Sequence, residues 1–182
     1  MTYFQSPELL IRDMTDPDVA ARVADDMAHG WETSDARHRE RLIDAAAGRS
    51  IALTADYQGQ PAGFLSIYFP ARIYVYAERG IPELVDFGVF DKFWRRGIGS
   101  ALMDIAEGIV GERTDRVCLG VGLHSGYGTA QSLYVRRGYI PDGTGVWYQD
   151  KVCEPYGECC NDDDLILYMV KELGGHPCKQ NN

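Results

Sequence analysis

Two glycines and two arginines lie together where an expected strand passes into an expected helix. Residues 94–100 read W-R-R-G-I-G-S, after a β-prone stretch at 83–90, and apolar residues recur at helical spacing from Ile98 onward. Glycines at a helix N-terminus let a ligand approach the backbone, and the unpaired N–H groups there favour an anion. Arginine side chains add charge-assisted donors. The stretch therefore predicts a phosphate-binding turn, although an ordinary strand–helix turn can share the pattern.

The turn lacks the signatures of two common phosphate loops. A P-loop needs G-K-[ST], and no such tripeptide occurs in this stretch. The dinucleotide fingerprint G-x-G-x-x-G/A needs a small third residue, and that place is taken by Leu102. A different kind of phosphate-binding turn is therefore expected.

The turn resembles motif A of the GNAT superfamily of acyl-CoA-dependent N-acyltransferases, [Q/R]-x-x-G-x-[G/A]. Here the frame is W-R-R-G-I-G, with Trp94 where the motif has Gln or Arg. A second stretch, T-A-Q-S-L-Y-V-R-R-G-Y at 129–139, is similar to the family's A-x-x-[LF]-Y-x-x-x-G-[FY]. The two motifs occur in the family's order, and the resemblance covers roughly residues 8–171.

The resemblance implies an α/β (α+β) fold: a single GNAT-type domain over residues 1–182, with its core at about 8–171. The implied architecture is a mixed sheet of six to seven strands with splayed parallel central strands, flanked by about four helices. In the family, the first two helices form one wall of the acceptor site, with Trp31 and Glu32 in the loop between them. The residue patterns place helices at about 15–28, 34–47, 98–109 and 129–137, and strands at about 9–14, 51–57, 62–69, 83–90, 116–123, 146–149 and 164–171. Residues 71–80 are expected as a strand extension or a loop, and 141–145 as a turn.

The resemblance also implies the cofactor, acetyl-CoA as co-substrate with no metal. Backbone N–H groups of Phe87, Gly88 and Val89 would hold the pantetheine and the thioester carbonyl, although Gly88 can equally mark a bulge. Tyr127 takes a place where the family often has Asn, which makes it a further candidate CoA contact. The pyrophosphate would lie on the turn formed by Arg95, Arg96, Gly97, Ile98, Gly99 and Ser100.

Acyl transfer from a thioester to an amine needs a deprotonated amine and a proton for the leaving thiolate. By resemblance, Tyr134 is the general acid. Its helical spacing from Ala130 and Leu133 also fits an ordinary core tyrosine.

Two carboxylates on the expected strand at 83–90 compete for the role of base. Because side chains alternate along a strand, Glu83 and Asp86 should point to opposite faces unless a bulge near Gly88 resets the register. Glu83 is preferred, because several family members keep a glutamate base at the start of this strand. Burial at the strand end should also raise its pKa. Asp86 is the alternative.

Composition narrows the class of partner. The chain has 182 residues and a net charge of −9, which argues against nucleic acid or an anionic membrane and suits a cationic acceptor. No apolar run is long enough to span a membrane and no signal peptide is visible, so a cytoplasmic location with five free cysteines is expected. His124 is a candidate base or metal ligand or a plain surface histidine, and the spacing of Cys153, Cys159 and Cys160 matches no usual zinc frame. A homodimer is left open.

The sequence therefore predicts an N-acetyltransferase. It would move an acetyl group from acetyl-CoA to a primary amine of a small molecule or peptide, by direct attack in a ternary complex. One alternative is a non-catalytic acyl-CoA-binding or regulatory module, which would share the glycine turn without a competent acid and base. The other is a protein N-terminal acetyltransferase, which differs only in its acceptor.

Overall fold

The computed structural model describes residues 1–30 and 33–174. Trp31 and Glu32, in the expected acceptor loop, lie outside the described residues, and so does Cys178. None of the helices in the described ranges is long and apolar enough to cross a membrane.

The chain forms two compact units, each with its own helices and strands. The first comprises Met1–Phe69 and Leu84–Ile109, and the second comprises Pro70–Glu83 and the chain from Val110 onward. The predicted mixed α/β class is confirmed. That the whole chain acts as one domain, with splayed central strands, stays a prediction.

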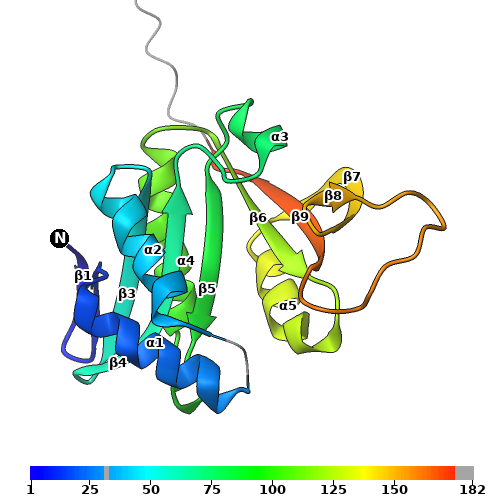
Figure 1. The fold of residues 1–182 in the computed structure, drawn as a ribbon. Coiled ribbons are helices and arrows are strands. Elements are labelled where there is room, and N and C mark those ends of the chain that lie inside the picture. The colour runs from blue at the N-terminus through cyan, green and yellow to red at the C-terminus, as the bar shows by residue number, and fades with distance from the viewer. Residues whose placement is uncertain (31–32, 175–182) are drawn as a thin grey trace, which may run out of the picture. The chain divides into compact units, whose positions relative to one another are not determined.

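The strands of the first unit run in the spatial order β1-β2-β3-β4-β5 (Figure 1). Antiparallel pairing places Ile11 of β2 opposite Ala55 of β3, and Leu53 of β3 opposite Leu65 of β4. All four side chains are at most 1% exposed, so they form the centre of this unit's core. The strand bounds are Thr2–Gln5 (β1), Leu9–Asp13 (β2), Ser50–Tyr57 (β3), Gln60–Tyr68 (β4) and Glu83–Val89 (β5).

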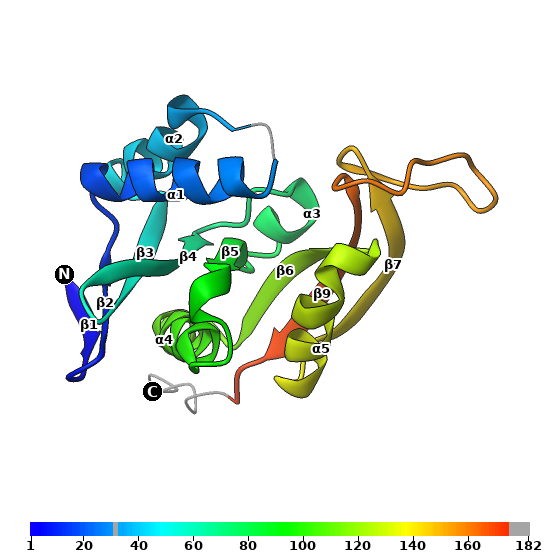
Figure 2. The same ribbon diagram turned by 90° about the horizontal axis from the view of Figure 1, so that it is seen from below.

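Helices α1 (Asp16–Ala28) and α2 (Asp35–Ala46) cover one face of this sheet, and α4 (Ile98–Gly111) covers the other (Figure 2). Thr15 caps α1 in a capping box with Asp18. The Ser34 hydroxyl caps α2 by accepting from the Arg37 N–H. Both helix starts agree with the sequence prediction. In α4 the predicted apolar stripe faces inward, and Ile98, Leu102 and Ala106 are at most 1% exposed.

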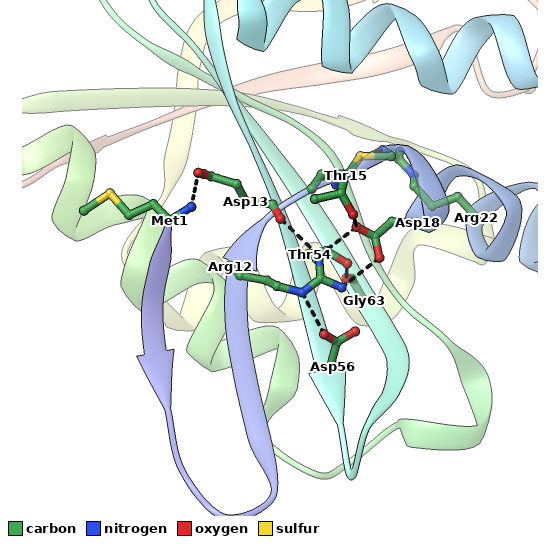
Figure 3. A network of polar contacts seen from close by, with 10 residues as sticks. Met1, Arg12, Asp13, Thr15, Asp18, Arg22, Thr54, Asp56 and Gly63 are labelled. Carbon is green, nitrogen blue, oxygen red and sulfur yellow. Dashed lines mark hydrogen bonds and ion pairs between the residues drawn. The ribbon is translucent and has the colours of Figure 1, made fainter.

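A polar network ties the first turn of α1 to the sheet. Figure 3 shows the Arg12 guanidinium of β2 between Asp18 of α1 and Asp56 of β3. Arg12 donates two hydrogen bonds to Asp18, at 2.8 and 2.9 Å, and its Nε donates to Asp56 at 2.9 Å. A bidentate arginine–carboxylate pair fixes orientation as well as distance. The network therefore sets where α1 lies on the sheet, which matters because α1 carries a buried arginine described below.

The second unit has an antiparallel sheet in the order β6-β9-β7-β8. Its core packs Tyr76, Cys118, Trp147 and Tyr168 together, all at most 4% exposed. The elements are α3 (Tyr74–Ala77), β6 (Arg116–Gly122), α5 (Gly128–Arg136), β7 (Ile140–Tyr148), β8 (Lys151–Val152) and β9 (Leu165–Glu172).

The structure differs from the local expectations at three places. Residues 71–80 contain the short helix α3, so they do not extend a strand; the alternative of an acceptor-side loop stays a prediction. The expected turn at 141–145 lies within β7, whose pairing with β9 shifts register between Pro141 and Val146. Strands β1 and β8 were not foreseen, because a short strand is defined by its pairing partner. In the case of β1, the Met1 amino group and the Tyr3 hydroxyl both bond Asp13 of β2.

Candidate functional site

The turn before α4 has the backbone of an anion-binding helix start. Gly97 lies in the left-handed region at φ 80°, which glycine adopts without a steric penalty. Its carbonyl accepts the first helical bond, from the Ala101 N–H at 3.0 Å, so the helix begins at Ile98 as predicted. The N–H groups of residues 98–100 belong to the first turn, where an α-helix supplies no internal acceptor. They are available to an anionic ligand.

Both arginines of this turn are exposed. Arg95 has φ 61°, an uncommon value for a residue other than glycine. The Arg96 guanidinium lies 5.5 Å from the centre of the Tyr57 ring, a cation–π arrangement. The turn thus combines backbone donors with two exposed positive charges.

The turn is fastened to the end of β5. The Trp94 indole N–H donates to the Val89 carbonyl at 2.7 Å, so Trp94 is a hydrogen-bond donor at the place where the family motif has Gln or Arg. A Cβ atom on Gly99 would lie 3.1 Å from the Phe87 ring and 3.4 Å from the Val89 side chain. Gly99 therefore lets α4 pack closely on β5, a structural reason for the second glycine besides ligand approach.

Strand β5 is irregular, but the left-handed residue is not the glycine. Asp86 has φ 52°, two residues before Gly88. Gly88 is required by packing instead, because a Cβ atom there would lie 2.7 Å from the Phe64 ring of β4. The candidate N–H donors of Phe87, Gly88 and Val89 therefore follow directly after a kink in the strand.

Asp86 is already engaged as an ion-pair partner. Its Oδ2 accepts from the Arg41 Nε of α2 and lies 3.8 Å from an Arg22 Nη of α1. Burial alone would raise the pKa of the Asp86 carboxyl, but the hydrogen bond and charge of Arg41, with Arg22, lower it. A carboxylate held ionised in this way takes up a proton poorly, which makes Asp86 the weaker of the two candidate bases.

Glu83, in the second unit, has a different environment. It is 5% exposed, and its Oε2 accepts from the Arg72 backbone N–H at 2.7 Å. Burial raises the pKa of the Glu83 carboxyl, with the backbone N–H groups of Arg72 and Ile73 opposing the shift. The predicted direction of the shift is confirmed. Its role as base stays a prediction.

Tyr134 lies on α5 and is 6% exposed, with its ring 5.9 Å from that of Tyr139. Burial, and to a lesser extent Tyr127, raises the pKa of the Tyr134 hydroxyl. The hydroxyl therefore keeps its proton at neutral pH, as a proton donor must. The same burial is what a core tyrosine would show, so its role as acid stays a prediction.

Tyr127 and His124 share one carboxylate. The Tyr127 hydroxyl donates to Asp163 Oδ1 at 3.0 Å, and His124 Nε2 lies 2.9 Å from the same oxygen. His124 Nδ1 accepts from the Gly126 N–H at 3.0 Å, so both of its ring nitrogens have partners. These contacts favour a loop-fixing role for His124, and a CoA contact by Tyr127 stays a prediction.

A comparison with known protein families shows which family the chain belongs to. The acetyltransferase (GNAT) family matches residues 17–139, a range that includes α1 from Pro17 onward, α4, the turn between β5 and α4, and Tyr134. The chain belongs to the GNAT family. It is therefore an acyltransferase, and the predicted family and enzyme class are confirmed. No curated protein matches the chain by sequence.

Solved structures of GNAT proteins share the fold. An acetyltransferase from Salmonella typhimurium that modifies the N-terminal serine of ribosomal protein L7/L12 has a TM-score of 0.68 at 15% identity, over 94% of this chain and 99% of its own. A ribosomal-protein-alanine N-acetyltransferase from Brucella melitensis has 0.65 at 20% identity, over 90% and 99%. yncA from Salmonella typhimurium, solved with its cofactor acetyl-CoA, has 0.64 at 16% identity, over 93% and 96%.

The cysteines of this GNAT protein are free thiols where the structure describes them: Cys118 is buried, and Cys153, Cys159 and Cys160 lie in or near the loop before β9. Within residues 1–30 and 33–174, no group of three His, Cys, Asp or Glu side chains could hold a metal ion. That catalysis needs no metal stays a prediction.

Sequence reasoning missed Arg22 and Arg41, which flank Asp86. Each is 4% exposed, an unusual burial for arginine. A signal was present in α1, because Arg22 recurs with Asp18, Val19 and Asp26 at spacings of three and four on the buried face. Charged residues on an apolar helix face usually have buried partners. In this GNAT chain one partner is Asp86 of β5.

Proposed function

We propose that the chain transfers an acetyl group from acetyl-CoA to a primary amine by direct attack in a ternary complex. The observation that carries this proposal is the turn from Arg95 to Ser100, with its left-handed Gly97, open first-turn N–H groups and two exposed arginines. An anionic pyrophosphate suits such a helix start. Family membership and the acetyl-CoA in the yncA structure support the same cofactor.

In this proposal backbone N–H groups of β5 hold the acyl group. The N–H groups of Phe87, Gly88 and Val89 would bind the pantetheine and the thioester carbonyl. Donors fixed by the fold stabilise charge that develops on the carbonyl oxygen in the transition state. The packing of Phe64 against Gly88 and of Phe87 against Gly99 supports a rigid arrangement of this segment.

Proton transfer is assigned to Glu83 and Tyr134, with Asp86 retained as the alternative base. Glu83 would take a proton from the ammonium, directly or through one water, which frees the nitrogen lone pair. The nitrogen attacks the carbonyl carbon, a C–N bond forms, and the C–S bond breaks. Tyr134 would donate its proton to the departing thiolate, the amide nitrogen would release its remaining extra proton, and solvent would restore both side chains. The net products are an acetamide and CoA.

The acceptor would be the primary amine of a small molecule or a peptide. A net charge of −9 suits a cationic acceptor. Two of the similar solved structures are of enzymes named for acetylating ribosomal proteins. This supports a protein N-terminus as the second candidate acceptor. The free thiols suit the reducing cytoplasm as the compartment.

An acceptor panel tests this function. Purified protein is given acetyl-CoA with polyamines, aminoglycosides, amino acids, or peptides that begin with Ser or Ala, and CoA release and product mass are measured. We expect one class to be acetylated at nitrogen, with no product from the same compounds after chemical blocking of the amine. Tight acetyl-CoA binding without CoA release for any acceptor would favour the non-catalytic binding module instead.

A further inference from the structure

The kink in β5 is maintained by residues far away in the sequence. Asp86 adopts φ 52°, a left-handed conformation that aspartate adopts more readily than most residues but less readily than glycine. Such a conformation persists only where the surroundings hold it in place. In β5 the holding contact is the hydrogen bond from Arg41 Nε to the Asp86 carboxylate.

Arg41 is itself fixed in position. It is 4% exposed, and its Nη1 donates to the Tyr68 hydroxyl at 3.1 Å, while that hydroxyl donates to Asp44 Oδ2 at 2.5 Å. The chain of contacts thus runs from α2 through β4 to α2 again, and leaves the Nε of Arg41 aimed at β5. An arginine locked by other hydrogen bonds is a rigid support for its carboxylate.

Arg22 acts on the same segment from α1. Its guanidinium lies 3.9 Å from the centre of the Phe64 ring, and an Nη lies 3.8 Å from Asp86 Oδ2. The Phe64 ring is also the group that excludes a side chain at position 88. Helices α1 and α2 therefore contact β5 at two points, at Asp86 through charge and at Gly88 through Phe64.

We infer that Arg41 and Arg22 are positioning residues that hold Asp86 in its left-handed conformation and thereby aim the N–H groups of residues 87–89. This inference rests on the proposed function of those N–H groups. It assigns α1 and α2 a role in orienting the acyl group, and it gives Asp86 a conformational role besides its candidacy as the alternative base.

The charges of the cluster permit a clean test. Arg41 and Asp86 carry opposite charges and form an ion pair, so removing both leaves the net charge unchanged. The double variants Arg41→Met/Asp86→Gly and Arg41→Met/Asp86→Ala have the same charge and differ by one methyl group. Only the glycine variant adopts a positive φ without a steric penalty.

The measurement is the dissociation constant of acetyl-CoA and of CoA, by calorimetry. We expect Arg41→Met and the double variant with alanine to bind acetyl-CoA about tenfold more weakly than wild type, within the range known for residues that act through others. The double variant with glycine should recover most of this loss. CoA keeps the pantetheine but lacks the acyl carbonyl, so its binding should be weakened less than that of acetyl-CoA. The control Arg39→Met removes an exposed arginine of α2 and should bind like wild type.

Equal affinities for the glycine and alanine variants, or unchanged affinity in Arg41→Met, would overturn the inference while leaving the proposed function standing. A wild-type protein that binds no acetyl-CoA would overturn the proposed function, and the inference with it. If Arg41→Met does not fold, the single variants Asp86→Gly and Asp86→Ala provide the same one-methyl comparison. Because binding is measured, loss of a base cannot imitate the expected result.

Discussion

Glu83→Gln is expected to lower kcat/KM by about a hundredfold or more, within the range for proton-transfer groups, and to abolish the acidic limb of the pH profile. The side-chain carbonyl of glutamine can still accept from the Arg72 N–H, so the local structure should persist. A base works only when deprotonated, so the wild-type rate should fall as pH falls through the pKa of Glu83. Because burial raises that pKa, the limb should lie above the ordinary value of 4.5.

A stability measurement checks the same group without any acceptor. A carboxyl whose pKa is raised by folding binds its proton more tightly in the folded state. The contribution of Glu83, measured as the free energy of unfolding of wild type minus that of Glu83→Gln, should therefore decline as pH rises from the ordinary carboxyl pKa through the raised one. A difference that does not change with pH would contradict a raised pKa at Glu83.

Asp86→Asn is the comparison for the base assignment. The pKa of Asp86 is lowered by Arg41, so an aspartate base there would place any acidic limb below the ordinary carboxyl range. If Asp86→Asn alone loses both rate and limb, the roles of the two carboxylates are reversed. If neither variant does, the amine is deprotonated by solvent and the protein works by positioning.

Tyr134→Phe is expected to lower kcat by about ten- to a thousandfold, with little change in the KM for acetyl-CoA. The substitution removes one hydroxyl and keeps the buried ring that packs on Tyr139. The chemical step must be rate-limiting for the effect to appear, so the rate is measured in a single turnover.

Tyr139→Phe is the matched control. Tyr139 is a buried neighbour, 1% exposed, and loses the same group in the same environment. We expect it to keep wild-type turnover. Equal rates for wild type and Tyr134→Phe would instead indicate that Tyr134 is an ordinary core tyrosine.

Much of the fold could be predicted from the sequence, because helix starts and buried helix faces depend on residues that are close together in the chain. Thr15 and Pro17 start α1, and the apolar stripe from Ile98 forms the buried face of α4. Strand β1 is different, because it is not among the predicted strands and is defined by its pairing, for example of Phe4 with Ile11 of β2. The residues that a short edge strand contacts are not visible in its own pattern.

The candidate site also has one part that the sequence could predict and one part that it could not. The glycine turn could be predicted, since Gly97 and the start of α4 are adjacent in sequence. The kink in β5 could not, because the left-handed Asp86 depends on Arg41, 45 residues earlier in the chain. From the sequence, a bulge near Gly88 was only one of the alternatives; in the structure the positive φ lies at Asp86, and Gly88 packs against Phe64.

The most direct test of the account is a single turnover with acetyl-CoA labelled in its acetyl group, in the presence of an acceptor found by the panel. Direct attack predicts that labelled acetamide and free CoA appear at the same rate, with no label on the protein. Labelled protein formed before product would contradict direct attack. Label released as free acetate, or CoA that is never released, would contradict N-acetyl transfer itself.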